Sequence, residues 1–300
     1  MVKQDDILSS AEGYQLSLAV FPAKNAKASI QVIHGMQEHK ERYFEFAAFL
    51  QEHGYNVIVS DLRGHGNTAP NLSHIANKHG DKLILQDQQE ITKYIQERFQ
   101  GVPVYILAHS MGTMITRTLL QNDSRNYKKV ALSGYVNPNP AAPVAVMLGN
   151  LVGLFKKPDG HSKLLTSLAV GPFAKSIKDR KTDLDWLSYN EENVQNYIKD
   201  PLCGVEFTVG SYRALFQFMN KMGKAKLYKD IDPELPFLLI SGESDPCTGG
   251  EKGRKASYKV LQKAGYKNIE VITLEHMRHE ILQEVEKEKV YNDILNFFDK

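Results

Sequence analysis

Short apolar runs rich in β-branched residues recur along this sequence, and stretches with helical spacing lie between them. Apolar residues share one helix face in the stretch 84–99 and again in the stretch 290–297. Strands that alternate with helices indicate the α/β class, a mostly parallel central sheet flanked by helices on both faces. Functional groups in such sheets gather at the carboxyl ends of the strands. The apolar runs fall at residues 30–33, 57–59, 104–107, 130–132, 237–240 and 269–274.

The alternation of strands and helices stops between about Val136 and Thr208. This segment opens with the proline-rich stretch 137–143 and contains no convincing strand. We therefore expect an α/β core formed by residues 1–136 and 209–300, with residues 137–208 inserted over it as a helical cap, or lid. A length of 300 residues suits one large domain that carries such an insertion.

Residues 144–155 place apolar side chains at helical spacing, and the opposite face of the same helix is apolar or small as well. We expect such a helix either to be buried on both sides or to line an apolar cavity. Leu148, Leu151 and Phe155 are therefore candidates for a substrate pocket. The surrounding apolar run is about five residues too short to span a bilayer, which leaves transient peripheral contact with a membrane open.

The composition excludes several classes of protein. The formal net charge is +2, which argues against nucleic acid as a partner. The two cysteines, Cys203 and Cys247, provide no disulfide framework, and this fits a reducing compartment. The first residues lack the basic-then-apolar layout of a signal peptide. We expect a cytoplasmic protein.

The segment Ala108-His-Ser-Met-Gly112 joins a predicted strand to a predicted helix. The small residues Ala108 and Gly112 flank Ser110 at the two positions where bulk would force strand and helix apart. The pattern A-x-S-x-G differs by one methyl group from the G-x-S-x-G nucleophile elbow. A serine that only caps a helix would also fit this fragment alone.

A serine nucleophile needs a base and an orienting acid, each at the end of a later strand. Asp245 follows one apolar run and His279 follows the next, so the chain order is Ser, Asp, His, as in α/β-hydrolases. Glu243 is an alternative acid, but Asp245 lies farther from the strand, where the loop can turn toward the histidine. His276 is an alternative base, but His279 stands where the helical pattern begins.

A serine nucleophile that attacks a carbonyl group also needs two backbone N–H groups that bind the oxyanion. The N–H of Met111, which follows Ser110 at the start of the helix, is the first candidate. The loop after an early strand normally supplies the second donor. Gly35 allows a sharp turn in that loop, and we expect the N–H of Met36 to be this donor.

Other motifs do not indicate a cofactor or a metal. The stretch 64–69 matches a relaxed dinucleotide pattern, G-x-G-x-x-A, but Pro70 follows at once and no helix is predicted there. His276, His279 and Glu280 would need metal ligands from elsewhere, and no zinc-like spacing or phosphate-binding loop occurs. Cys247 follows the wrong strand for a nucleophile and is expected to pack in the interior.

These segments resemble the monoacylglycerol lipase and lysophospholipase branch of the α/β-hydrolases, grouped with the serine aminopeptidase S33 type. The resemblance covers nearly the whole chain. Departures are mild: Ala108 replaces a glycine, Gln37 stands where a smaller residue is common, and Thr68 stands where serine is usual. The matching segments are His34-Gly-Met-Gln-Glu-His39 with Arg42-Tyr43, residues 60–66, 108–112, 242–246 and 278–280, and, in the cap, residues 185–188 with Val194, Tyr197 and residues 200–204.

The resemblance implies an α/β-hydrolase fold and assigns nucleophile, acid and base to Ser110, Asp245 and His279. It places the oxyanion donors at Met36 and Met111. The implied reaction is hydrolysis of a carboxylic ester through an acyl-enzyme, without a metal or organic cofactor and without an obligate protein partner. The apolar cap favours a substrate with a single acyl chain, a monoacylglycerol or a lysophospholipid.

Two alternatives stay open. An aminopeptidase of the S33 type would hold the ammonium group of a peptide with acidic side chains of the cap, for which Asp183, Asp185, Glu191 and Glu192 are candidates. Such residues also form ordinary solvated helix faces. A non-catalytic binding module on the same fold would typically have lost a member of the triad, and all three are present here.

Overall fold

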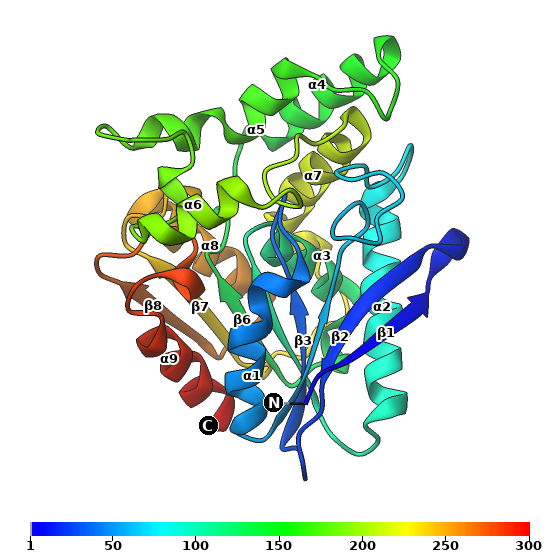
Figure 1. Ribbon diagram of the computed structural model, residues 1–300, viewed down its shortest axis with the longest axis vertical. Coiled ribbons are helices and arrows are strands. Elements are labelled where there is room, and N and C mark those ends of the chain that lie inside the picture. The colour runs from blue at the N-terminus through cyan, green and yellow to red at the C-terminus, as the bar shows by residue number, and fades with distance from the viewer. Residues whose placement is uncertain (1) are drawn as a thin grey trace.

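A central sheet of eight strands organises the computed structural model, which describes residues 2–300 (Figure 1). The strands lie side by side in the order β1-β2-β4-β3-β5-β6-β7-β8. All pairs from β4 to β8 are parallel, whereas β1 pairs with β2, and β2 with β4, in the antiparallel sense. The strands are β1 Gln4–Ser9, β2 Gln15–Phe21, β3 Ala28–Ile33, β4 Tyr55–Ser60, β5 Val104–His109, β6 Lys129–Ser133, β7 Phe237–Gly242 and β8 Ile269–Leu274.

The six apolar runs of the sequence are the strands β3 to β8, so the predicted parallel sheet is confirmed. The antiparallel pair β1–β2 extends it at one edge (Figure 1). The helices are α1 Phe44–Glu52, α2 Gly80–Arg98, α3 Met111–Asp123, α4 Ala142–Phe155, α5 Lys163–Ser176, α6 Glu191–Lys199, α7 Val209–Met222, α8 Gly250–Ala264 and α9 Lys287–Asp299.

Helices cover both faces of the sheet, and each face has its own apolar core. On one face α1 and α9 bury Phe46, Leu50 and Ile294 against side chains of β3, β4 and β7. On the other face α2, α3, α7 and α8 form the second cluster. Alternate side chains of a strand point to opposite faces. Both faces of the strands β3 to β7 are therefore buried, as their apolar runs require.

Residues 137–208, here named the cap segment, contain α4, α5 and α6 and no strand. Figure 1 shows these helices at one end of the sheet, and α7 leads from them back to the core. Helix α7 packs against α4 and also against α2 and α3. The division of the chain into a core and a separate cap stays a prediction. None of the helices within residues 2–300 combines the length and the apolar character needed to cross a bilayer.

Two expectations about local structure are wrong. Helix α4 is not buried on both sides, because Val144, Met147 and Leu151 are about half exposed, and Leu154 and Phe155 are 77% and 83% exposed. Apolar character on both faces of a helix predicts burial, but a helix at the surface can carry it as well. The chain after His279 forms only a 3₁₀ turn, and the helix α9 begins at Lys287.

Candidate active site

Ser110 sits on a sharp turn between β5 and α3. Its backbone adopts φ 50° and ψ −117°, a conformation that residues other than glycine rarely adopt. Its N–H donates to the carbonyl of Ser133 at 3.1 Å. A Cβ atom at Gly112 would lie 2.1 Å from the carbonyl oxygen of Ile33, so only glycine fits there. The close approach of α3 to β3 therefore explains the small residue at this position of the motif.

A chain of hydrogen bonds joins Ser110 to two residues from later loops. His279 Nε2 lies 2.8 Å from Ser110 Oγ, and His279 Nδ1 lies 3.0 Å from Asp245 Oδ2. The second oxygen of Asp245 accepts from the N–H of Cys247 at 2.8 Å. Asp245 and His279 are buried, whereas Glu243 and His276 are exposed. The structure thus brings Ser110, His279 and Asp245 together and leaves both alternatives at the surface.

The surroundings of His279 favour a charge on its ring. Burial by itself would lower its pKa, but the carboxylate of Asp245 raises the pKa of His279 well above the ordinary value of 6.5. The rings of His109 and Trp186 lie 4.7 Å and 5.1 Å from the imidazole. Burial, and next the charge of His279, lower the pKa of His109 to about 4. His109 is therefore a neutral neighbour at neutral pH.

The loop after β3 lies against Ser110. A Cβ atom at Gly35 would lie 3.0 Å from Ser110 Cβ, so glycine lets the backbone approach the serine. The Gly35 N–H donates to Glu38 Oε1 at 2.5 Å, which holds the turn. Among the described residues, neither the N–H of Met36 nor that of Met111 donates to a protein acceptor. Both predicted donors remain available to an oxyanion.

Glu38 belongs to a buried charge network that also reaches the cap segment. Arg42 Nη1 lies 2.9 Å from Glu38 Oε2 and 2.6 Å from Glu280 Oε1, and Arg42 Nη2 donates to Asn193 of α6 at 3.0 Å. Burial alone would raise the pKa of Glu38, but Arg42, then His109 and other neighbouring charges, lower it to about 2. The ionised carboxylate thus remains a strong acceptor for the loop.

A cavity of about 280 Å³ opens next to Ser110. Helix α5 and the 3₁₀ turn Asp185–Leu187 supply most of its apolar wall, and the ring of Trp186 lies between the cavity and the packed side chains of the cap segment. The lining residues are Gly35, Met36, Gln37, Glu38, His109, Ser110, Thr166, Ser167, Val170, Gly171, Ala174, Asp183, Leu184, Trp186, Leu187, Tyr197, His279 and Glu280.

The cavity does not include the three pocket residues that the sequence suggested. Leu148, Leu151 and Phe155 belong to α4, and the wall comes from α5 instead. Sequence analysis missed α5 because Gly171 and Pro172 interrupt its helical pattern. In the sequence, the segment Asp185-Trp186-Leu187 stands out only through the family resemblance. Trp186 is the single tryptophan of the chain, and this was the sequence feature that could have marked it as a wall residue.

A serine on a strand–turn–helix junction, followed along the chain by an aspartate and a histidine on this sheet, defines an α/β-hydrolase. The chain belongs to the serine aminopeptidase S33 family, whose model matches residues 24–286. It is thus a hydrolase of the branch that includes monoglyceride lipases and phospholipases.

Relatives and solved structures agree with this placement. Human monoglyceride lipase is 27% identical over 290 residues, 93% of this chain and 85% of the relative. Phospholipase YtpA of Bacillus subtilis is 23% identical over 91% of this chain and 95% of its own. The crystal structure of a thermostable carboxyl esterase from Bacillus coagulans superposes with a TM-score of 0.92 at 22% identity, covering 100% of this chain and 98% of that one.

Proposed function

We propose that the protein is a serine hydrolase that cleaves carboxylic esters with a single acyl chain, such as monoacylglycerols or lysophospholipids, through an acyl-enzyme. The hydrogen-bond chain from Asp245 through His279 to Ser110 is the observation that carries the proposal. Its order and distances match what nucleophilic catalysis by serine requires. The names of the lipase and phospholipase relatives support the same substrate class.

In the proposed mechanism His279 Nε2 takes the proton of Ser110 as Oγ attacks the ester carbonyl. Asp245 stabilises the imidazolium that forms. The N–H groups of Met36 and Met111 donate to the oxyanion of the tetrahedral intermediate. His279 then protonates the leaving alcohol. A water molecule attacks the acyl-serine in the same way, which releases the acid and restores Ser110.

The cavity beside Ser110 suits an acyl chain. Val170 and Ala174 of α5 and Leu184 offer apolar surface, and the small residue Gly171 leaves room between them. Each CH₂ group that leaves water for such a wall contributes about 0.8 kcal/mol. An acyl chain therefore gains affinity with length until the cavity is full.

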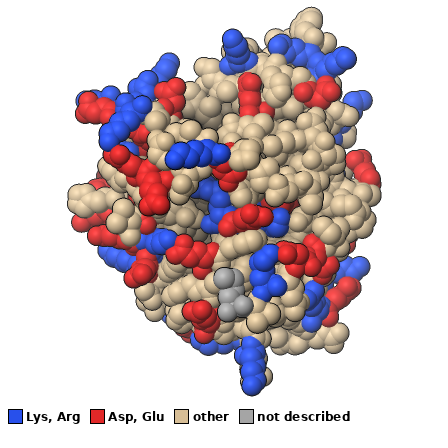
Figure 2. Space-filling view, viewed as in Figure 1, with Lys and Arg blue, Asp and Glu red and all other residues tan. Residues whose placement is uncertain are grey.

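The outer surface of the cap segment supports contact with lipid. Helix α4 carries several exposed apolar side chains, and α5, which supplies part of the cavity wall, exposes Leu164 and Leu168. Exposed apolar groups of this extent are a feature of surfaces that meet a membrane or a partner. On the face drawn in Figure 2, basic and acidic side chains are mixed rather than gathered in one field. We infer that transient contact with a lipid surface supplies the substrate.

The aminopeptidase alternative has weaker support. Of the four acidic residues considered for it, only Asp183 lines the cavity, and Arg180 lies 3.1 Å from its carboxylate. Asp185 accepts from the N–H of Lys181, and Glu191 pairs with the side chain of Lys181. These carboxylates do not converge on a site for an ammonium group. A non-catalytic module has no feature in its favour, because the three triad residues are bonded to one another.

Hydrolysis of p-nitrophenyl esters and of aminoacyl-anilides by the same preparation tests the proposal. We expect esters to be hydrolysed with a kcat/KM at least about a hundredfold higher than that for the anilides. A fluorophosphonate probe should label the wild-type protein at Ser110, because only an activated serine attacks it.

The Ser110→Ala variant is the matched control. It should retain the thermal unfolding of the wild type while losing ester hydrolysis and labelling. Preferred cleavage of the anilides would favour the aminopeptidase, and full ester hydrolysis by Ser110→Ala would refute the serine mechanism.

A further inference from the structure

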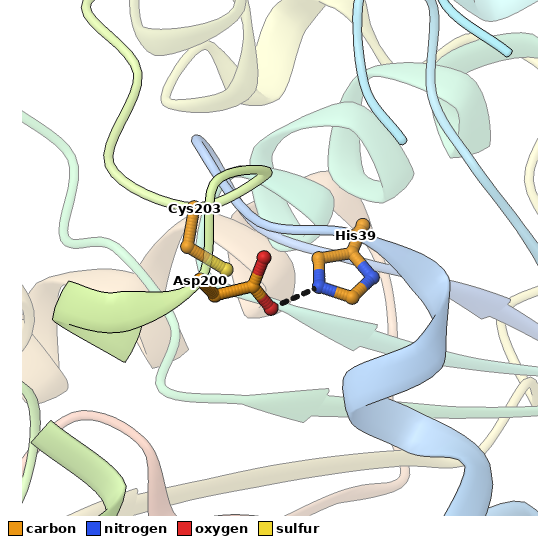
Figure 3. A group of neighbouring side chains, drawn as sticks. All are labelled: His39, Asp200 and Cys203. Atoms are coloured by element: carbon orange, nitrogen blue, oxygen red, sulfur yellow. Dashed lines mark hydrogen bonds and ion pairs between the residues drawn. The ribbon is translucent and has the colours of Figure 1, made fainter. Parts of the chain in front are cut away.

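Three potential metal ligands meet where the cap segment contacts the core, outside the triad (Figure 3). His39 belongs to the core, in the loop that follows β3. Asp200 ends α6 of the cap segment, and Cys203 lies in the turn after it. None of the three lines the cavity beside Ser110. The proposed reaction does not use them.

The donor atoms of these residues lie close together. His39 Nε2 lies 2.8 Å from Asp200 Oδ2, and the nitrogen, oxygen and sulfur donors all lie within 4.8 Å of one another. Figure 3 shows the ring of His39 and the sulfur of Cys203 directed toward the carboxylate of Asp200. Ligands of a tetrahedral zinc ion lie about 3–4 Å apart, given bond lengths of about 2.0–2.3 Å.

The backbone prepares Asp200 and Cys203 for this arrangement. The N–H of Leu202 donates to Asp200 Oδ1 at 2.9 Å, which orients the carboxylate and leaves Oδ2 for the site. The Cys203 N–H donates to the carbonyl of Asp200 at 3.1 Å, so the thiol is held in a tight turn. The next residue, Gly204, is anchored to the core by a bond to the carbonyl of Gln37 at 2.9 Å.

Burial and charge suit a divalent cation with one open position. The side chains of His39 and Cys203 are nearly buried, whereas that of Asp200 is 29% exposed, so a water molecule can reach the fourth position. A carboxylate and a thiolate together balance a charge of +2, and coordination releases the thiol proton to solvent. The neighbouring cation Arg42 is balanced by Glu38 and Glu280.

We propose that His39, Asp200 and Cys203 form a zinc-binding site that joins the cap segment to the core. Imidazole, carboxylate and thiolate ligands in one set select zinc over the hard cations magnesium and calcium. His39 comes from the same loop as Met36, so an ion at this site connects the cap segment to the loop of a predicted oxyanion donor. The site is therefore placed to fix the cap segment against the core.

A second set of donors provides an internal control. Asp245, Cys247 and His279 also lie within 4.8 Å of one another and are buried, but Asp245 is bonded to His279 Nδ1 and Ser110 to His279 Nε2, so both ring nitrogens of the histidine are engaged. An ion at that place would block the base. The two sets contain one cysteine each, so replacement of either thiol distinguishes them.

The test titrates the full-length protein with Co²⁺ as an optical probe and then with Zn²⁺ as a competitor. We expect one Co²⁺ per chain, a thiolate-to-cobalt charge-transfer absorption, and displacement of the cobalt by zinc. Cys203→Ser should remove this absorption and weaken Co²⁺ binding at least about a hundredfold, more than changes in the outer shell of a metal site do. Cys247→Ser should keep both the absorption and the single ion.

Thermal melts complete the design. Zn²⁺ should raise the Tm of the wild type and of Cys247→Ser, since an ion that binds only the folded state stabilises it, and it should leave the Tm of Cys203→Ser unchanged. If Cys203→Ser fails to fold, Asp200→Asn, which keeps the shape of the side chain, should show the same weakened binding. Absence of a thiolate absorption in the wild type, or its loss in Cys247→Ser with retention in Cys203→Ser, would overturn the proposal.

Discussion

Ser110 is held in a backbone conformation with positive φ that costs on the order of 1–3 kcal/mol for a residue with a side chain. The hydrogen bond to Ser133 and the packing of α3 against β3 through Gly112 keep it there. Strain of this kind is concentrated at functional positions. The conformation lifts Oγ away from the strand and toward His279, which separates this serine from one that merely caps a helix.

Replacement of the two histidines in the loop after β8 tests which one is the base. We expect His279→Ala to lower kcat at least roughly a thousandfold, because triad residues act as a unit. His276→Ala is the matched control from the same loop, and its exposed side chain should contribute little. Steady-state kinetics with a short p-nitrophenyl ester measure both. The opposite pattern would move the base to His276.

The pH dependence of kcat/KM reports the pKa of His279 in the free enzyme. The base acts in its neutral form, so activity should rise with pH, and the midpoint should lie above pH 6.5 because Asp245 raises this pKa. Asp245→Asn removes the anion and leaves burial, which lowers the pKa. The midpoint should therefore move to lower pH, and kcat should fall by about 10⁴-fold. An unchanged midpoint would show that Asp245 does not act on this histidine.

At the scale of elements, strands β3 to β7 could be predicted because each contains an apolar run that is almost fully buried. Strand β8 lies at the edge of the sheet and is partly exposed, but its apolar residues still marked it. Strand β1 could not be predicted, since it has only two apolar residues, Ile7 and Leu8, without alternation, and lies largely exposed at the edge of the sheet. The alternation Leu16, Leu18, Val20 in β2 was a usable signal for the antiparallel pair. The segments that carry Ser110, Asp245 and His279 could be predicted from their position after strands. Their contacts with the cap segment depend on tertiary packing and could not be predicted.

The cap segment was the least predictable part of the site. Its most apolar helix, α4, faces solvent with one side, and the more polar α5 lines the cavity. Hydrophobicity alone therefore selects α4 as the helix that lines the cavity, whereas α5 lines it. A cavity forms where small residues such as Gly171 leave room between larger side chains. The number of apolar side chains in a helix does not predict where such room exists.

A carboxylate placed in α5 tests the wall of the cavity. Val170→Asp should reduce kcat/KM for long-chain esters more than for acetyl esters, because a charge beside the acyl chain forfeits several increments of about 0.8 kcal/mol per CH₂. Leu151→Asp on the exposed face of α4 is the control and should leave hydrolysis of dissolved esters unchanged. A thermal melt of each variant separates loss of fold from loss of specificity. An equal loss for all chain lengths in Val170→Asp would refute the acyl pocket.

At the scale of the whole molecule, Arg42, whose side chain is largely buried, connects three regions of the chain. Arg42 binds Glu38 of the loop beside Ser110, Glu280 of the loop that carries His279, and Asn193 of α6. Asn193 in turn donates to Glu280 at 2.6 Å. The cap segment and two functional loops therefore share one set of charges, and displacement of any of them disturbs the others.

Removal of this arginine should destabilise the fold. Arg42→Met leaves the buried carboxylates of Glu38 and Glu280 without a cation, and breaking a buried pair in this way typically costs about 3–5 kcal/mol. Chemical denaturation measures the change in the free energy of unfolding. Arg125→Met removes an exposed pair with Asp230 and should have no measurable effect. Equal stability of the two variants would show that the Arg42 network does not contribute to the free energy of unfolding.

The order of the triad along the chain has a consequence for biosynthesis. Ser110 and His279 are separated by 169 positions, a distance that a ribosome covers in roughly 10–30 s at about 5–20 residues per second. During that interval the nascent polypeptide contains Ser110 and its turn but not His279, the proposed proton acceptor. Under the proposed mechanism, hydrolysis begins only after β8 and the loop that carries His279 have been translated and have joined the sheet, so an unfinished chain would be inactive.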